Sequence, residues 1–523
     1  MQGKNDSQSV NVFKRRASAP LYVSKNQCVL EGFETPFDQQ LSKNNRWVKL
    51  SHLIPWDKIV SQYNHQFQSN EGRPAINGRV IIGALIIKHI LNLTDRETIL
   101  QIEENMFMQY FLGYSSFTNE APFSATLFVE IRKRLTFTII NTINDIVIAH
   151  QLELEQKQKL KKENNDGDKL QEPPKGASPI ENKEDIPHNA NTLAINNKGT
   201  LLMDATVAPQ NITFPTDLKL LNAAREKSEK LIDKLHCVKI HGTKKVRTYR
   251  NIARKEFLNT IKKKAKTYKE IYKSNGRQIR YLKRNLSHID FLLAAYKEKG
   301  IRHPLKQKHF IYINTLQTVY EQQQQMHSTN TRSIENRIVN IHQAHVRPIK
   351  RGKEGVKVEF GSKLQVSLVN GFSCIDTLSW DNFNEGIYLQ DSVEKYKVRF
   401  GHYPKEVLAD KIYCNRANRQ WLKARGIRLA AKPLGRPSKE ALSNQVSPGE
   451  RNPIEGKFGQ AKVAYGLDNI KAKLKTTSES WIATTFLVLN LLNLARLAAL
   501  CQKFIETLIF ILLRKSKINT PSF

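Results

Sequence analysis

The chain has 523 residues and a formal net charge of +35 at pH 7, because 83 Lys and Arg residues outnumber 48 Asp and Glu residues. This length suffices for two or three domains, and the one-sided charge indicates a polyanionic partner, nucleic acid before an anionic membrane. The five cysteines are scattered and form no Cys-x-x-Cys pair. They argue against a disulfide framework or a zinc site and favour a reducing cytoplasm.

The first 150 residues divide into a tail and a helical domain. Residues 1–32 are polar and basic and lack the apolar segment of a signal peptide, so we expect a disordered basic tail. Residues 33–150 are expected to form an all-α N-terminal domain. Within it, Arg79–Leu93 predicts an apolar helix, and Thr94 followed by Glu97 has the form of a capping box that opens another helix. Short helices with basic ends fit either a DNA-binding helix-turn-helix-like module or a plain helical scaffold.

Residues 151–199 are rich in Lys, Glu, Asn, Gln and Pro and almost lack aromatic residues. A stretch of this composition buries too little apolar surface to order itself. It predicts a disordered linker that precedes the catalytic part of the chain.

The part after the linker changes to short apolar runs. Thr200–Val207 predicts a buried strand that carries Asp204 near its end. An Asn-Gly pair at positions 370–371, between alternating apolar runs, predicts a β-hairpin. A short strand ending at Asp410 and a further strand after it alternate with helices. This alternation predicts an α/β catalytic domain over residues 200–475.

A long helical insertion is expected within that domain, over residues 217–346. Its segment Lys234–Arg284 holds 18 Lys and Arg residues against two acids, with apolar and aromatic residues interleaved. Positive charges gathered in one segment repel one another and lower the stability of the protein unless a polyanion neutralises them. The segment therefore predicts helices with one packing face and one DNA-binding face. The candidate DNA contacts in it are Lys244, Lys245, Arg247, Arg250, Arg254, Lys262, Lys263 and Lys264.

Three carboxylates are the candidate catalytic residues. Asp204 and Asp410 each end an apolar strand, and Glu455 lies in the first turn of a predicted helix. Each has a structural alternative: strand-end aspartates cap helices, and Asn452 as N-cap with Pro453 at the first helical position would make Glu455 an ordinary helix-start residue. Together, however, the three supply hard oxygen ligands for divalent ions. Two such ions, about 3.5–4 Å apart, stabilise the attacking and leaving oxygens of a phosphodiester displacement.

The helix that carries Glu455 adds two cations to the same face. Arg451 precedes Glu455 by four residues and Lys462 follows it by seven, so all three side chains lie on one side of a helix. Arg and Lys beside a metal-binding carboxylate suit phosphate oxygens. An ion pair between Arg451 and Glu455 is the structural alternative, and the two interpretations are compatible.

These motifs resemble those of the DDE transposases of bacterial insertion sequences. The resemblance rests on Met203–Val207 with Phe214–Leu218, on Ala409–Tyr413, and on Arg451–Gly459. The spacing Arg-x3-Glu-x6-Lys is similar to the family's signature, but the Tyr expected three residues before the Arg is Pro448 here. Within residues 33–135, Glu104-Asn105, Gln109–Gly113 and Arg132–Arg134 resemble the helical N-terminal domain of the same proteins.

The resemblance implies a ribonuclease-H-like (retroviral-integrase-like) catalytic core with a long helical insertion. It implies that Asp204, Asp410 and Glu455 hold two Mg²⁺ ions, which Mn²⁺ can replace. It also implies a protein that binds the inverted repeats of its element, cuts a strand with activated water, and joins the freed 3′-hydroxyl to target DNA. Arg451, Asn452, Lys462 and Lys411 are further expected DNA contacts. The implied partners are double-stranded DNA and a second copy of the chain, with neither a membrane nor a small-molecule substrate, in a bacterial cytoplasm.

Other functions remain open at this point. A metal-dependent nuclease of the same fold would use the same carboxylates without joining strands. A catalytically silent DNA-binding derivative or a basic RNA-binding protein would explain the charge, but neither explains the three carboxylates. Residues 476–523 predict two apolar C-terminal helices rather than a membrane span, because Asn490 and Asn493, among other polar residues, interrupt the apolar stretch.

Overall fold

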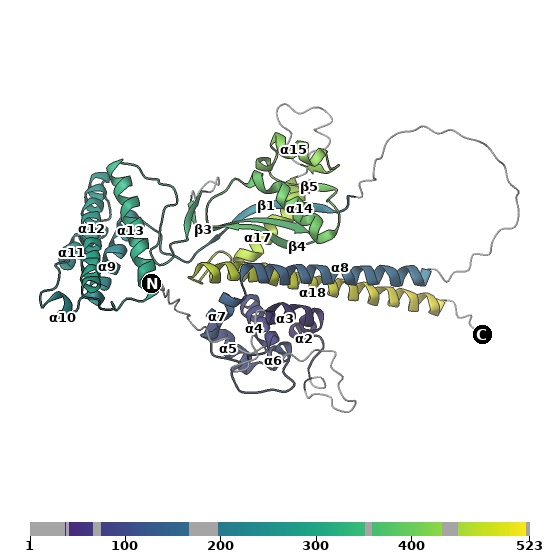
Figure 1. The fold of residues 1–523 in the computed structure, drawn as a ribbon. Coiled ribbons are helices and arrows are strands. Elements are labelled where there is room, and N and C mark those ends of the chain that lie inside the picture. The colour runs from purple at the N-terminus through teal and green to yellow at the C-terminus, as the bar shows by residue number, and fades with distance from the viewer. Residues whose placement is uncertain are drawn as a thin grey trace, which may run out of the picture.

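The computed structural model describes Phe37 and residues 41–65, 75–166, 197–350, 358–430 and 448–518. The predicted tail over residues 1–32 lies outside the described residues. Residues 167–196 of the predicted linker also lie outside them. The described part is a mixed α/β protein with a helical N-terminal domain, a six-stranded sheet and a separate bundle of helices (Figure 1).

The N-terminal domain is helical, as its apolar periodicity predicted. Its helices are α2 (Arg46–Leu53), α3 (Trp56–Asn64), α4 (Gly78–Ile90), α5 (Asp95–Glu104), α6 (Met106–Leu112), α7 (Leu127–Arg134) and α8 (Phe137–Asp166). The apolar helix α4 is the centre of this domain, and Ile81, Ile86 and Ile87 are almost fully buried. Thr94 caps α5 by accepting a hydrogen bond from the backbone N–H of Glu97 at 3.1 Å.

Helix α8 corrects the predicted start of the linker. The sequence placed a disordered segment from residue 151, whereas α8 continues to Asp166. Helix α8 packs along the C-terminal helix α18 (Lys475–Ile518) over much of its course (Figure 1). The buried apolar side chains described in it, Ile140, Ile143, Val147 and Ile148, all precede residue 151.

The sheet has the strand order β2-β3-β1-β5-β6, with β4 also paired to β3. Its strands are β1 (Thr200–Pro209), β2 (Arg347–Lys350), β3 (Val358–Val369), β4 (Phe372–Ser379), β5 (Glu406–Leu408) and β6 (Arg428–Ala430). Strand β1 pairs antiparallel with β3 and parallel with β5, so it lies in the middle of the sheet. The predicted hairpin is present between β3 and β4, where Asn370 and Gly371 have positive φ angles of 50° and 81°.

Helices cover both faces of the sheet. Leu364, Val366 and Leu368 pack on one face against α17 (Asn452–Tyr465) and α18. On the other face, Leu201 and Met203 pack against α14 (Leu389–Phe400) and α15 (Arg416–Lys423). Short 3-10 helices η1 (Glu385–Tyr388), η2 (Lys411–Tyr413) and η3 (Pro448–Arg451) lead into α14, α15 and α17.

A helical bundle occupies the chain between β1 and β2, where the sequence predicted the insertion. It consists of α9 (Asp217–Leu235), α10 (Val238–His241), α11 (Arg250–Ile261), α12 (Tyr268–Glu298) and α13 (Gln307–Ser328). Helices α9, α12 and α13 have their own core, in which Leu221, Leu282 and Leu316 are fully buried. The bundle projects from one end of the sheet, on the opposite side from the described C-terminal end of α18 (Figure 1).

The C-terminal apolar stretch is one helix, not the predicted pair. Its polar residues do not break it because they have buried partners: Asn490 donates to Asn144 Oδ1 at 2.7 Å and accepts from the backbone N–H of Ser373 at 2.8 Å. Among the described residues, Lys475–Leu500 is one helical stretch long and apolar enough to cross a membrane, and 67% of its apolar window is buried inside the protein. Packing against the sheet and the N-terminal domain accounts for this apolar character.

Candidate active site

Asp204 lies in the middle strand of the sheet, on the face covered by α17. Its side chain is 19% exposed and accepts a hydrogen bond from the backbone N–H of Ala205 at 2.8 Å. Burial raises the pKa of Asp204 to about 6, and the negative charges of Glu385 and Asp410 add to this rise, while the Ala205 N–H and Arg451 oppose it. A cation near this carboxyl would therefore relieve an unfavourable charge.

Asp410 lies directly after β5, the strand parallel to β1. It occupies the N-cap position of η2, and its Oδ1 accepts from the backbone N–H of Lys411 at 2.8 Å. The capping role that the sequence offered as an alternative is therefore present. Its side chain nevertheless remains 58% exposed on the side of Arg451. The adjacent parallel strands β1 and β5 thus carry the two aspartates into one region.

Arg451 joins these two aspartates. Its Nη1 donates to Asp410 Oδ1 at 3.2 Å, and its Nη2 lies 3.5 Å from Asp204 Oδ2. The Nε of the same guanidinium is buried and has no hydrogen-bond partner in the described part of the chain. A guanidinium shared by two carboxylates marks the position where a positive charge is favourable between them.

Glu455 follows Arg451 by one turn of α17. It is exposed, and no ion pair or hydrogen bond joins it to another described residue. The predicted helix start is wrong in one respect: α17 begins at Asn452, so Arg451 holds the N-cap position, and no side chain caps the helix. Asn452 is exposed rather than capping, because η3 runs directly into α17. The capping arrangement that would have given Glu455 a structural role is therefore absent here.

The other expected contacts near these carboxylates lie at the edge of the site. Lys462 is half-buried on α17, two turns beyond Glu455, and Lys411 is exposed beside Asp410. The structure adds Glu385, which the sequence analysis missed. Glu385 raises the pKa of Asp204 and forms an ion pair with Lys363 at 2.8 Å. No local pattern marks Glu385, because η1 reaches the site only through its packing against η2.

The donor set fits a hard divalent cation, although its geometry is incomplete. Within the described ranges, no three His, Cys, Asp or Glu side chains are grouped closely enough to hold a metal ion. Asp204 and Asp410 are brought together by Arg451, and Glu455 is on the helix that begins directly after that arginine. Carboxylate oxygens are the ligands that Mg²⁺ prefers. Glu455, unpaired among the described residues, is the side chain that would have to turn toward the aspartates.

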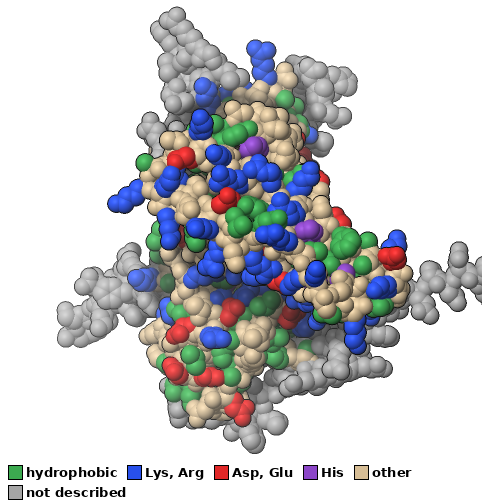
Figure 2. Space-filling model, turned by 90° about the vertical axis from the view of Figure 1, so that its left-hand side faces the viewer, with side chains coloured by type: hydrophobic (Ala, Val, Ile, Leu, Met, Phe, Trp, Pro, Cys, Tyr) green, Lys and Arg blue, Asp and Glu red, His purple; other side chains and the backbone are tan. Residues whose placement is uncertain are grey.

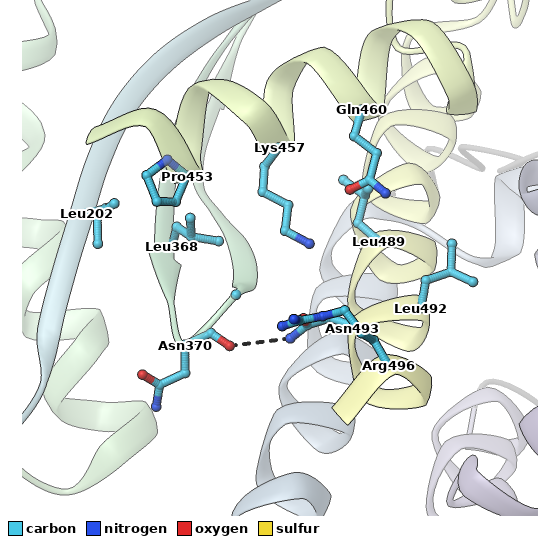
Figure 3. A pocket seen from close by; sticks show the side chains of 11 residues that line it. Leu202, Leu368, Asn370, Pro453, Lys457, Gln460, Leu489, Leu492, Asn493 and Arg496 are labelled. Carbon is cyan, nitrogen blue, oxygen red and sulfur yellow. Dashed lines mark hydrogen bonds between the residues drawn. The ribbon is translucent and has the colours of Figure 1, made fainter. Parts of the chain in front are cut away.

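A pocket of about 500 Å³ lies between α17, α18 and the strands β1 and β3 (Figure 3). Lys457 points into it from α17 and Arg496 from α18, beside leucines of β1, β3 and α18. Burial and the charge of Arg496 lower the pKa of Lys457. Because no carboxylate lines this pocket, it is separate from the candidate active site.

The candidate DNA contacts of the insertion fall into two groups. Lys245 and Arg250 form ion pairs with Asp233, and Lys263 pairs with Glu270 at 2.5 Å, so these charges are compensated within the chain. The others are exposed and have no ion pair among the described residues: Lys244, Arg247, Arg254, Lys262 and Lys264. Figure 2 shows that the outer face of the bundle carries many Lys and Arg side chains and few acids.

Comparison with known proteins identifies two segments of the chain. Residues 407–492 match the family described as "Transposase DDE domain", and residues 35–134 match "Transposase domain (DUF772)". The first segment contains Asp410, Arg451 and Glu455, while Asp204 lies outside it. An uncharacterized protein of Rhizobium meliloti, ORF8 in the nfe locus, is 31% identical over 103 residues, which are 20% of this chain and 49% of that protein. The aligned region thus spans about half of that relative. No solved structure matches the chain.

Both matched segments are transposase domains, one near the N-terminus of the chain and one that includes Asp410 and Glu455. These matches confirm the resemblance to DDE transposases seen in the motifs of the chain.

Proposed function

We propose that this transposase binds the inverted repeats of its own element, cuts DNA strands there, and joins the freed 3′-hydroxyl to target DNA. The observation that supports this most directly is the link from Arg451 to Asp204 and Asp410. Arg451 is at the start of the helix that carries Glu455, so one side chain connects the three elements that hold the three carboxylates.

The proposed catalytic core is a ribonuclease-H-like domain. A mixed sheet with helices on both faces supports this assignment, as does the position of the carboxylates on two adjacent parallel strands and a covering helix. The helical bundle between β1 and β2 is an insertion into that core under this proposal.

Asp204, Asp410 and Glu455 are the residues that would hold two Mg²⁺ ions, or Mn²⁺ in their place. Bound there, divalent ions supply Lewis-acid stabilisation of the attacking and leaving oxygens of a phosphodiester displacement. Arg451 then releases the two aspartates and binds phosphate oxygens instead. Its planar guanidinium can donate two parallel hydrogen bonds to one phosphate group. Lys462 adds a point charge further along the same helix, and Lys411 and Asn452 contact the strand at the rim.

DNA is the proposed partner on both the element and the target side. The large net charge of +35 and the basic outer face of the insertion support binding to a duplex backbone. Two element ends require two active sites, so we propose a dimer of the chain on DNA.

The test uses the full-length protein, Mg²⁺, and linear DNA that carries the sequences flanking its gene. Asp204→Asn and Asp410→Asn should each reduce strand cleavage by about 100-fold or more while binding of the ends survives, because each removes a charge that would hold a divalent ion. Asp381→Asn is the matched control, since Asp381 is exposed at the end of β4. Cleavage by either aspartate variant at the wild-type rate contradicts the proposal.

The same reaction separates a transposase from a nuclease. A supercoiled target plasmid is added, and the products are examined for covalent joining of the cut ends to the plasmid. Joined products support strand transfer, whereas cutting alone would leave a metal-dependent nuclease of this fold.

A further inference from the structure

Arginine and tyrosine side chains alternate in a stack within the basic insertion. The guanidinium carbons of Arg247 and Arg284 lie over the ring of Tyr249, at 4.5 and 4.6 Å from its centroid. The Arg284 guanidinium also lies 5.7 Å from the ring centroid of Tyr281. We call these four residues the Arg–Tyr stack. It joins the turn before α11 to the middle of α12.

Tyr249 is an unfavourable residue for its position. Its backbone is left-handed, with φ 56° and ψ 26°, a conformation that suits Gly or Asn and costs an aromatic residue about 1 kcal/mol or more. It is also the N-cap of α11, yet its side chain makes no capping hydrogen bond. Asn or Gly would meet both demands better. The local backbone therefore does not explain the tyrosine, whose ring instead contacts Arg247 and Arg284.

The two arginines of the stack carry uncompensated charge. Neither Arg247 nor Arg284 forms an ion pair with a described residue, and Nη1 of Arg284 is buried without a hydrogen-bond acceptor. Two other cations of the same turn behave differently, because Lys245 and Arg250 both pair with Asp233 on α9. The turn is thus anchored by the two cations that pair with Asp233, whereas Arg247 and Arg284 contact aromatic rings and form no ion pair with a described residue.

Stacking leaves a guanidinium suited to one kind of ligand. An arginine that lies flat on a ring uses its face for the contact and keeps its in-plane N–H donors for a planar or tetrahedral anion. Arg247 is exposed, and Tyr249 is half-buried beside it, on the basic bundle seen in Figure 2. Phosphate groups of a nucleic-acid backbone fit such donors, and a duplex offers them in series.

We propose that the Arg–Tyr stack is a preformed clamp for the phosphate backbone of duplex DNA, with Tyr249 holding Arg247 and Arg284 in position. This inference rests on the proposed function for the identity of the DNA, which is the duplex at the end of the element. It goes beyond the general charge of the insertion because it assigns the contact to four residues, and two of them are uncharged.

The experiment measures the affinity of the full-length protein for a duplex that carries the sequence flanking its gene, at several salt concentrations and without divalent metal. Arg247→Gln and Arg284→Gln should each weaken binding about tenfold and reduce the slope of log affinity against log salt by about 1, which corresponds to one phosphate contact. Arg302→Gln is the matched control, because Arg302 is an exposed arginine beyond the end of α12. A loss no larger than that of the control would overturn the proposal.

Tyr249→Gly separates a clamp from a purely structural stack. Glycine relieves the left-handed backbone, so the melting temperature should stay the same or rise while DNA affinity falls. Tyr249→Phe should retain both the stability and the affinity, because it keeps the ring. A lower melting temperature with an unchanged salt slope in Tyr249→Gly would assign the stack to folding alone, and tighter binding of a duplex RNA of the same sequence would also contradict the proposal. Binding is measured without metal, so its outcome does not depend on whether the protein cuts DNA. Failure of this inference can therefore be told apart from failure of the proposed function.

Discussion

Arg451 donates from Nη1 to Oδ1 of Asp410 at 3.2 Å, so the N-cap residue of α17 holds the carboxylate that follows β5. The same guanidinium lies 3.5 Å from Asp204 on β1. In the DNA-free protein this arginine therefore compensates the charge of both aspartates, in the position where a divalent cation would also be attracted. Under the proposed function, Arg451 and a divalent cation would compete for the two aspartates until Arg451 binds a phosphate group.

This competition predicts opposite effects of one substitution. Arg451→Gln should tighten the binding of Mn²⁺ to the DNA-free protein several-fold, because it frees two carboxylates and removes a positive charge. The same change should slow strand cleavage by about 100-fold, because the transition state loses a phosphate-binding fork. Titration calorimetry with Mn²⁺ and a cleavage assay measure the two effects, and weaker Mn²⁺ binding in the variant would contradict the competition.

Gly361 tests the contact between the two longest strands of the sheet. A Cβ atom at this position would lie 2.1 Å from the carbonyl oxygen of Ala208 and 2.9 Å from Cα of Pro209, both in the backbone of β1. Gly361→Ala should therefore lower the free energy of unfolding by about 3 kcal/mol or more, because β1 and β3 must separate. Gly459→Ala is the control: it faces open space on α17 and should stabilise the protein by about 0.5–1 kcal/mol. Chemical denaturation measures both, and equal effects would contradict this account.

Arg399 should be the strongest single link between the N-terminal domain and the sheet. It donates from Nε to Asp145 on α8 at 2.9 Å and from Nη1 to the fully buried Asp376 on β4 at 3.2 Å. Burial raises the pKa of Asp376, and Arg399 opposes that rise. Arg399→Met should cost about 3–5 kcal/mol of unfolding free energy, because it leaves a buried carboxyl without its cation.

Two further variants identify the source of that loss. Adding Asp376→Asn to Arg399→Met should restore part of the stability, since the buried charge is then removed. Lys133→Met breaks an exposed pair with Glu130 and should cost less than about 1 kcal/mol. If the double variant is no more stable than Arg399→Met, the loss does not come from the uncompensated charge.

We expect the folding stability to depend on pH through His345. Burial, followed by the charges of Lys475 and Arg347, lowers the pKa of His345 from 6.5 to about 4, and its ring packs edge-on against Trp380 at 4.3 Å. The unfolded chain thus binds a proton near pH 6.5 that the folded chain resists. This contribution to stability is present above pH 6.5 and is lost as the pH falls toward 4, by about 1–3 kcal/mol at most. Thermal melts of wild type and His345→Gln from pH 7.5 to 4 measure the difference, which should shrink as the pH falls. A constant difference would contradict the pKa assignment.

Local chemistry explains which features were predictable from the sequence. The hairpin at Asn370-Gly371 was predicted because the turn demands two positive φ angles. The helix that carries Glu455 and Lys462 was predicted from helical spacing, but Arg451 lies at its N-cap, outside the predicted helix. The link from Arg451 to Asp204 has no such signal, because it depends on how α17 lies across the sheet.

Two predictions from the sequence were wrong, each for its own physical reason. α18 was divided in two because Asn490 and Asn493 looked like interruptions, yet they bond to groups from β4, α8 and the β3–β4 turn. Asn452 was assigned as a cap because its local sequence suits one, whereas η3 continues into α17 and places Arg451 there. Tertiary contacts decided the outcome for α18, and the preceding 3-10 helix decided it for Asn452.

The role of Glu455 is the central claim, and one substitution tests it most directly. Glu455→Gln keeps the side-chain volume and removes the charge, and Glu450→Gln makes the same change on η3, just before Arg451. Each variant is assayed for Mg²⁺-dependent cutting of the flanking DNA and for Mn²⁺ binding by electron paramagnetic resonance. We predict that Glu455→Gln loses cleavage by at least about 100-fold and binds Mn²⁺ more weakly, while Glu450→Gln retains both and each variant still binds the DNA. Cleavage by Glu455→Gln at the wild-type rate would show that Glu455 is not part of the active site.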